Sequence, residues 1–354
     1  MDFTFSAEQR ELYNALCRFF MTEATPELMR ELWDSKSGRS PAMWRAMAEH
    51  GLTAVSVPEE LGGMGLGDLD WGLLSHSIGY YGVADPIADT AFIAVALLDA
   101  LGADSEVRNT WLPRVAAGEA RVAIGHPQNP LIADAHVAAL LLICTSDEVH
   151  AVDPAAVSLI PHTSLDPSRR LFEVKWTPTP RTLIASGRLA QSMCADVLDR
   201  GALASAGQLL GVTARMLDLT VDYAAERRQF GKPIGSFQAV KHLVADVSVK
   251  YKFARPVLFR AACAMAQRDP RRSVYVSHAK LAAGEAAGLA ARNCIQVHGA
   301  MGYTWDVDLQ IFAKRGWAIE GAWGDVAFHK MRIAEFVLRE DAPLGPGHTF
   351  ATTP

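Results

Sequence analysis

Proline is spread unevenly along this chain of 354 residues, and its distribution limits where long helices can form. Between residues 120 and 190 prolines recur too closely for long helices, because proline lacks the backbone N–H and clashes with the preceding turn. They are Pro127, Pro130, Pro154, Pro161, Pro167, Pro178 and Pro180. The short apolar runs between them, 137–144, 156–160 and 171–176, predict the strands of a small β domain.

The segment before residue 120 shows the signals of helices. Ser6 followed three residues later by Gln9 is a capping-box pattern, which predicts the start of a helix. Further helices are expected over 41–50, 71–79 and 90–101. Gly51 is expected to end the first of these, because glycine readily adopts the left-handed conformation that follows a helix.

After residue 190 the chain returns to helical spacing. One helix carries a near-heptad of apolar residues, at Phe237, Val240, Val244, Val247, Tyr251, Ala254 and Leu258. Such a repeat is typical of the seam of a helix bundle. The order of helices, strands and helices predicts an α+β fold. We expect an N-terminal helical domain over 1–117, a short central β domain over 118–191, a C-terminal four-helix bundle over 192–342 and a loose tail over 343–354.

Charge and composition exclude several classes of function. The chain has 34 Lys and Arg against 39 Asp and Glu, a net charge of −5, which disfavours a general nucleic-acid binder and a polybasic membrane anchor. The longest apolar runs, 91–98 and 137–144, are too short to cross a bilayer. The N-terminus lacks a basic region followed by an apolar core, so we expect no signal peptide and a cytoplasmic location. The five cysteines are far apart and are expected to be buried thiols.

Several common site motifs are missing. The glycine-rich loop over 62–67 does not read GxGxxG and does not join a strand to a helix in the way a dinucleotide site requires. The histidines form neither HExxH nor a zinc spacing, and no GxSxG elbow occurs, so we expect no metal site and no hydrolase triad.

Two segments of the C-terminal block carry more information. In the segment 224–241, Arg227, Arg228 and Lys232 surround a turn between two helices, the second expected to start at a Ser236 cap. Cations at such a turn suit a phosphate or pyrophosphate. In the segment 294–304, a helix is expected to run into a turn of small residues that lets another backbone or a ligand approach closely.

In this order and at this spacing, the two segments resemble the acyl-CoA dehydrogenase family. The resemblance extends over nearly the whole chain and includes the loop over 58–67. It implies an FAD-dependent enzyme that removes hydrogens from Cα and Cβ of an acyl-CoA thioester. A carboxylate takes the α proton, which the thioester carbonyl makes acidic, and the flavin takes the β hydride. An electron-transfer flavoprotein is the implied electron acceptor.

The resemblance also assigns residues. Arg227 matches the arginine that holds the FAD pyrophosphate, and Phe237 and Gln238 match the pair that contacts FAD at the start of the next helix. The segment matching the adenosine side of FAD comprises Gln296, Val297, His298, Gly299 and Ala300. Asp199 matches a substrate-contacting position just before the first C-terminal helix. The family binds this flavin with a neighbouring subunit, which implies an oligomer of two or four chains.

The sequence departs from the family in three places. Over 125–134 the hydroxyl and backbone donors expected near the flavin ring are not evident. Ala300 stands where the family has glycine. By the family's spacing the catalytic base falls at Trp323, while Glu320 precedes it by nearly one helical turn. Glu320 is therefore the candidate base, with Asp196 and Asp199 as alternatives.

These departures leave two main hypotheses and favour the first. In the first, the chain is the degenerate partner of a heteromeric α2β2 acyl-CoA dehydrogenase, in which the other chain supplies the base and this chain helps to bind FAD. Such assemblies act on bulky substrates such as steroid-derived thioesters. In the second, the chain is a self-sufficient dehydrogenase with a relocated base. A non-catalytic scaffold and an acyl-CoA oxidase-like relative remain as further alternatives.

Overall fold

The computed structural model describes residues 5–349, which form two compact units. Of these residues, the first unit contains 5–21, 68–82 and 202–349, and the second contains 22–67 and 83–201. The segments expected as an N-terminal domain are therefore divided between the units. The long helix α7 (Gly187–Glu226) contributes residues to both, and it begins before residue 192, where we expected the C-terminal block to start.

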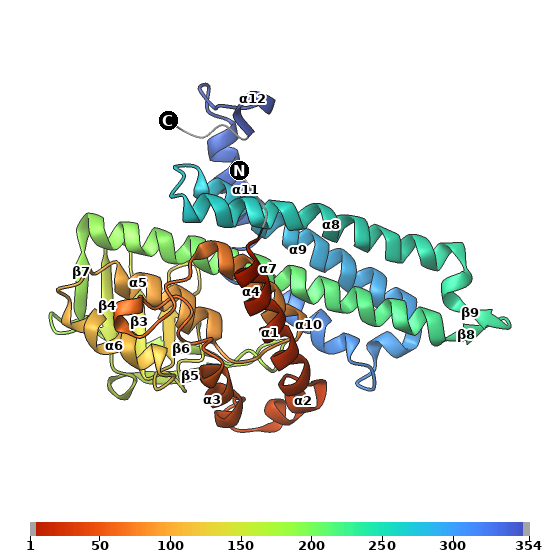
Figure 1. Cartoon of the computed structure of the whole chain (residues 1–354), viewed down its shortest axis with the longest axis horizontal. Helices are drawn as coiled ribbons and strands as arrows, with labels where there is room; N and C mark the ends of the chain where they lie inside the picture. The colour runs from red at the N-terminus through yellow and green to blue at the C-terminus, as the bar shows by residue number, and fades with distance from the viewer. Residues whose placement is uncertain (1–4, 350–354) are drawn as a thin grey trace. The chain divides into compact units, whose positions relative to one another are not determined.

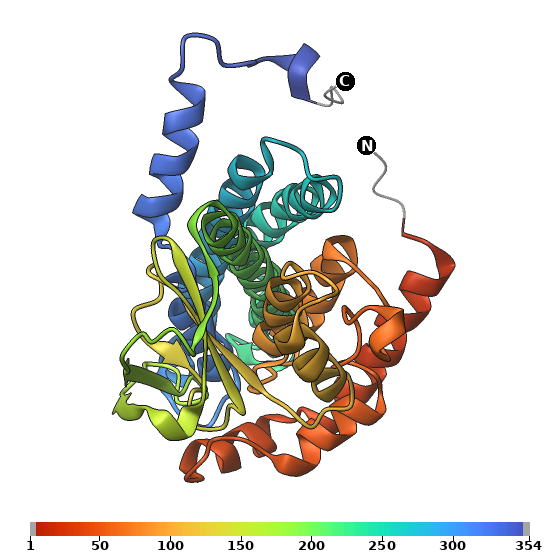
Figure 2. The same cartoon turned by 90° about the vertical axis from the view of Figure 1, so that its left-hand side faces the viewer.

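The first unit is helical (Figures 1 and 2). Its helices are α1 (Ala7–Glu23, up to residue 21), α4 (Asp68–Tyr80), the later part of α7, α8 (Gln238–Ala266), α9 (Arg272–His298), α10 (Leu309–Glu320), α11 (Val326–Val337) and α12 (Pro346–Thr349). Helix α9 packs against α8, α10 and α11, and its buried positions are rich in alanine. Small side chains let the neighbouring helices approach closely, which explains why the bundle is built around α9.

The capping box predicted at the start of α1 is confirmed. The Gln9 backbone N–H donates to Ser6 Oγ at 3.1 Å, and the Ser6 N–H donates to Gln9 Oε1 at 2.9 Å. Gln9 Nε2 also donates to Asp70 Oδ1 of α4 at 2.8 Å, so the cap residue joins two helices of the unit.

The second unit combines short helices with the strands. The helices are α2 (Pro26–Asp34), α3 (Pro41–Glu49), α5 (Val95–Asp99) and α6 (Glu106–Ala116), with a π-helical turn at Asp89–Ala94. Gly51, with φ of 78°, ends α3 as predicted. The glycine-rich loop after it folds on itself, because the N–H groups of Gly65 and Leu66 donate to the carbonyls of Val57 and Val55.

Two small sheets form the β part of this unit. One has the order β1 (Val122–Gly125), β3 (Leu140–Cys144), β4 (Glu148–Val152), β7 (Leu183–Ser186), with β1 and β3 parallel. The other has the order β2 (Ile132–Ala133), β6 (Leu171–Lys175), β5 (Ser158–His162) and is antiparallel. Side chains of both sheets share one core, at Ala123, Ile132, Ala135, Leu141, Ile143 and Val152.

The predicted strands are present with shifted bounds. The first begins at Leu140 rather than at residue 137, because the Val137 N–H bonds to the Asp134 carbonyl in a turn. The second begins at Ser158, since Pro154–Ala156 forms a 3₁₀ turn capped by Asp153. Strands β1, β2, β4 and β7 were not predicted. The α+β class with a small β part between helical blocks is confirmed.

Candidate functional site

The two segments singled out in the sequence meet at one end of the helical unit. Helix α7 ends at Glu226 and α9 ends at His298. The Tyr223 ring stacks on the His298 ring with a centroid distance of 4.2 Å and an interplanar angle of 17°. Asn293 Nδ2 also donates to the Leu243 carbonyl at 3.0 Å, which ties α9 to the first turns of α8. These contacts place the basic turn after α7 beside the glycine turn after α9.

The basic turn is a tight hairpin of β8 (Arg228–Gln229) and β9 (Lys232–Pro233). The backbone of Arg227 is held on both sides, because its N–H donates to the Tyr223 carbonyl and its carbonyl accepts from the Ile234 N–H, both at 2.8 Å. Its side chain is exposed. A fixed backbone with a free-standing guanidinium is suited to binding an anion outside this unit.

The cap expected at Ser236 is wrong. Helix α8 begins at Gln238 with Phe237 at the N-cap position, and Ser236 Oγ donates to the Pro233 carbonyl at 2.7 Å instead. Phe237 is half-buried, and the Lys232 ammonium lies 4.4 Å from the centre of its ring. The turn therefore combines cations with an aromatic ring, a pair of features that suits a phosphate carrying a flat ring system.

The glycine turn after α9 has a buried and an exposed part. His298 is buried and its Nδ1–H donates to the Cys294 carbonyl at 2.8 Å, while Val297 is also buried. Gln296, Gly299 and Ala300 are exposed. Gly299 has φ of 61° and ψ of −138°, a conformation that glycine alone adopts without strain. Of the matched positions in this turn, the exposed three can reach a ligand, and the buried two hold the turn in place.

Glu320 is the last residue of α10, and a buried lysine fixes the turn that follows it. Lys280 Nζ donates to the carbonyls of Glu320 at 2.7 Å and Ile319 at 3.2 Å, and it lies 3.5 Å from the Gly324 carbonyl. A cation at the C-terminal end of a helix complements the helix dipole and satisfies its last carbonyls. The Glu320 side chain is half-buried and lies against α9 at Gly284.

Trp323, at the family's spacing for the base, is buried with 6% exposure and a positive φ of 57°. Its carbonyl accepts from His329 Nε2–H at 3.0 Å, and His329 Nδ1 accepts from Ser277 Oγ–H at 3.1 Å. Lys280 and His329 thus hold the turn from both sides. An indole cannot take a proton from carbon, so this position supplies no base.

Acidification is expected to destabilise this turn. Burial, then the nearby Lys280 charge, lowers the pKa of His329 from 6.5 to about 4, and Nδ1 can accept from Ser277 only while the ring is neutral. Because the unfolded chain binds this proton at a higher pH than the folded chain, stability is lost as pH falls from about 6.5 towards 4. In urea titrations at pH 7 and pH 5, wild type should lose more stability than His329→Gln. Equal losses would contradict this assignment.

The alternative base candidates lie in the part of α7 that belongs to the second unit. Asp199 is within α7, not before the first C-terminal helix as expected, and its side chain is 1% exposed. Asp196 faces Arg200 one turn later, with Oδ2 and Nη1 3.5 Å apart. The Arg200 guanidinium also lies 5.8 Å from the centre of the Phe92 ring. Asp196 is therefore ion-paired within its own helix, and Asp199 is buried.

The segment over 125–134 forms the end of β1, a turn and β2. The Gln128 N–H donates to His126 Nδ1 at 3.1 Å inside that turn. Asp134 forms a buried ion pair with Arg39 at 2.6 Å. Asp134 is thus engaged in holding its own unit together.

Lys280 and His329 are site residues that the sequence did not reveal. Lys280 stands in an alanine-rich stretch of α9, where a lone lysine on the buried face is a detectable signal. Within residues 5–349, no cluster of three or more His, Cys, Asp or Glu side chains is arranged to hold a metal ion. In the same range, no helix combines the length and apolarity needed to span a bilayer.

This arrangement is that of a known family. Residues 6–119 match the family described as "Acyl-CoA dehydrogenase, N-terminal domain". Residues 192–338 match the family described as "Acyl-CoA dehydrogenase, C-terminal domain". The chain belongs to the acyl-CoA dehydrogenase family, whose members are FAD-dependent oxidoreductases acting on the CH–CH bond of acyl-CoA thioesters.

Individual proteins of this family and of this fold are also similar to the chain. The acyl-CoA dehydrogenase IpdE2 of Mycobacterium tuberculosis is 32% identical over 311 residues, which cover 87% of this chain and 90% of the relative. The ChsE4–ChsE5 complex from the same organism has a chain with a TM-score of 0.84 and 23% identity, covering 97% of this chain and 100% of that one. The steroid acyl-CoA dehydrogenase Tcur3481–Tcur3483 has a TM-score of 0.84 and 24% identity, with 93% and 97% covered.

Proposed function

We propose that this chain is the degenerate subunit of a cytoplasmic, heteromeric acyl-CoA dehydrogenase. In this proposal it helps to bind FAD, and an unlike chain of the same family supplies the catalytic base. The carrying observation is the contrast within the helical unit. The position of the base is a buried tryptophan, whereas the turns that match the FAD segments are exposed at the end of the bundle.

The residues of the two turns fit one end of FAD. The Arg227 guanidinium would bind the pyrophosphate, and Phe237 and Gln238 would contact the cofactor at the start of α8. Gln296, Gly299 and Ala300 would face the adenosine, with Val297 and His298 packed behind them. When bound, FAD supplies the hydride acceptor of the reaction. The exposed residues of the two turns have no other part of this chain covering them, so a flavin bound there can also contact a second chain. This favours a flavin shared between two chains.

The substrate in this proposal is a bulky acyl-CoA thioester such as a steroid-derived one. Support comes from two neighbours, one of them a complex of two chains and the other a steroid acyl-CoA dehydrogenase. Asp199, which the resemblance places on the substrate side, is 1% exposed, so we propose no direct substrate contact for it in this chain. An electron-transfer flavoprotein is the proposed electron acceptor. The flavin content of the chain, produced alone and together with a second family member, tests the proposal.

Glu320→Gln separates this proposal from the second candidate, a self-sufficient enzyme. The second candidate draws support from the half-buried Glu320 carboxylate, which lies at the end of α10 against Gly284 of α9. If a partner supplies the base, the isosteric amide should leave turnover of the assembled enzyme within about threefold of wild type. Removal of a true base lowers turnover by roughly 10²–10⁴-fold. Steady-state turnover with an acceptor dye distinguishes the two, and a loss of that size would make Glu320 the base.

A further inference from the structure

Two of the five cysteines lie side by side in the second unit, although they are distant in sequence. Cys144 is the last residue of β3, and Cys194 lies in the second turn of α7. The two side chains are hydrogen-bonded to each other. Both are buried, with 4% and 6% exposure, and both are free thiols. The pair is therefore a reduced dithiol whose members are in contact.

The face of β3 that carries Cys144 points away from the second sheet. Leu141 and Ile143 belong to the core that the two sheets share. Because side chains alternate along a strand, Cys144 lies on the opposite face, together with Leu140 and Leu142. Every residue of β3 is buried, so this opposite face is covered as well.

Helix α7 starts at the edge of the same sheet. The Gly187 N–H donates to the carbonyl of Asp147, in the turn between β3 and β4, at 2.8 Å. Only β4 separates β7, which α7 follows, from β3. From Gly187 to Cys194 the helix advances roughly 10 Å, which equals about two strand spacings. The buried stripe of this part of α7 includes the thiol and comprises Ala190, Met193, Cys194, Val197 and Leu198.

The hydrogen bond gives the two thiols different roles. Donation from Cys144 lowers the pKa of Cys194, while burial opposes that shift. The same bond, followed by burial, raises the pKa of Cys144. The thiolate is the form of cysteine that reacts with peroxides. We therefore expect Cys194 to react first, with Cys144 beside it as a protonated thiol.

The dithiol lies close to solvent-exposed backbone. Cys144 leads into the turn of the exposed Ser146 and Asp147, and Cys194 is followed by the exposed Ala195. A local opening at this edge of the sheet is enough to admit a molecule as small as hydrogen peroxide. The remaining three cysteines, Cys17, Cys263 and Cys294, belong to the first unit and cannot pair with these two within it.

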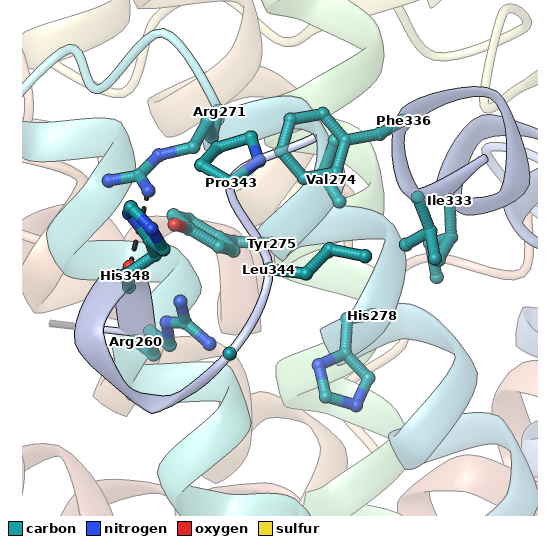
Figure 3. A pocket seen from close by; sticks show the side chains of 12 residues that line it. Arg260, Arg271, Val274, Tyr275, His278, Ile333, Phe336, Pro343, Leu344 and His348 are labelled. Carbon is teal, nitrogen blue, oxygen red and sulfur yellow. Dashed lines mark hydrogen bonds between the residues drawn. The ribbon is translucent and has the colours of Figure 1, made fainter. Parts of the chain in front are cut away.

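A cavity of about 280 Å³ in the helical unit is large enough to hold a peroxide molecule (Figure 3). Figure 3 shows Arg260, Tyr275 and His278 among the side chains of its wall. None of the described residues that line the cavity is a cysteine. Cys263, near the same end of α8, is buried with 4% exposure. The cavity therefore exposes no thiol of the helical unit to an oxidant.

We propose that Cys144 and Cys194 are a peroxide-sensitive dithiol that closes reversibly to a disulfide between the sheet and α7. The Cys194 thiolate attacks one oxygen of hydrogen peroxide, and the O–O bond breaks to give a sulfenic acid and hydroxide. The hydroxide takes up the proton that the thiol had lost and becomes water. The Cys144 sulfur then attacks the Cys194 sulfur, and the S–O bond breaks with release of a second water.

Two electrons pass in this sequence from the two thiols to the peroxide oxygens. A small dithiol reverses the step by thiol–disulfide exchange and is itself oxidised. Reversible disulfides of this kind are those found in reducing compartments, where they act as redox sensors. The site is independent of the proposed dehydrogenation.

The test is peptide mapping of the full-length chain, purified in reductant, treated with hydrogen peroxide, alkylated and digested without reduction. One cross-linked peptide pair should join Cys144 and Cys194, and the alkylated thiols should fall from five to three. Dithiothreitol should restore all five. The proposal is overturned if both thiols are alkylated as fully as before treatment. It is equally overturned if Cys17, which is half-buried, is oxidised before the pair.

Single serine variants test the two roles. In Cys144→Ser, the reaction should stop at the sulfenic acid of Cys194, which dimedone labels. In Cys194→Ser, Cys144 should remain an unlabelled thiol. Cys17→Ser is the matched control and should form the disulfide as wild type does. Labelling of Cys144 in Cys194→Ser, with no label in Cys144→Ser, would contradict the assigned roles. Thermal unfolding checks the fold of each variant, and the wild-type map decides the proposal without them.

Discussion

The dissociation constant of FAD from the assembled enzyme should rise roughly 10- to 100-fold when Arg227 is replaced by alanine. A hydrogen bond to a charged group contributes about 1.5–3 kcal/mol, and each 1.4 kcal/mol is a factor of ten in affinity. The exposed guanidinium stands on a backbone that is hydrogen-bonded on both sides, so its loss should leave the fold intact. Titration of the apoprotein with FAD, followed by flavin fluorescence, measures the change.

Arg228→Ala is the matched control, because Arg228 is the next residue, is exposed and carries the same charge. A diffuse attraction between the basic turn and the pyrophosphate would make the two variants equally weak binders. If Arg227 binds the pyrophosphate directly, Arg227→Ala should bind FAD clearly more weakly than Arg228→Ala does. An equal loss of FAD affinity in the two variants would therefore contradict the assignment of Arg227 to the pyrophosphate.

Gly211→Ala should destabilise the helical unit by about 3 kcal/mol, because α4 and α7 cross with their backbones in contact at this residue. An added Cβ would overlap the His76 carbonyl oxygen and lie 2.5 Å from the Tyr80 backbone nitrogen. Backbone cannot rotate away as a side chain can, and overpacking typically costs 1–3 kcal/mol, occasionally more. The midpoint of urea unfolding, followed by circular dichroism, measures this.

Gly288→Ala on α9 provides the comparison for that experiment. Its added Cβ would meet only Arg292 Nη1, at 3.8 Å, which is an ordinary contact at a flexible side-chain end. Since alanine favours the helix over glycine by about 1 kcal/mol, this variant should be as stable as wild type or more so. If both variants unfolded at the wild-type midpoint, the close crossing of α4 and α7 would be refuted.

The sequence predicted those helix ends at which neighbouring residues bond or terminate the backbone of the helix. The Ser6–Gln9 capping box and the Gly51 terminator depend only on neighbouring residues, and both are present. Strands β1 and β4 were missed because four or five residues that are mostly buried show no alternation of apolar and polar side chains. Strands β2 and β7 were missed because two and four residues are too short to show a period. The division into two units was also out of reach, since it depends on contacts between segments distant in sequence.

The site was predictable in its parts but not in its assembly. The sequence identified the basic turn and the glycine turn, while the Tyr223–His298 stack that joins them is a tertiary contact. The resemblance assigned His298 to FAD contact, yet in the structure this side chain is buried and bonded to the Cys294 carbonyl. Helical spacing alone could not show that Lys280 reaches the carbonyls at the end of α10.

The most direct test of the central claim is the visible absorbance spectrum of the chain purified alone and after co-production with a second, unlike member of the family. The account predicts a colourless chain alone. It predicts a yellow complex of both chains that reduces an acceptor dye when given an acyl-CoA. A chain that is yellow and reduces the dye on its own would contradict the account, and a complex without flavin would contradict it as well.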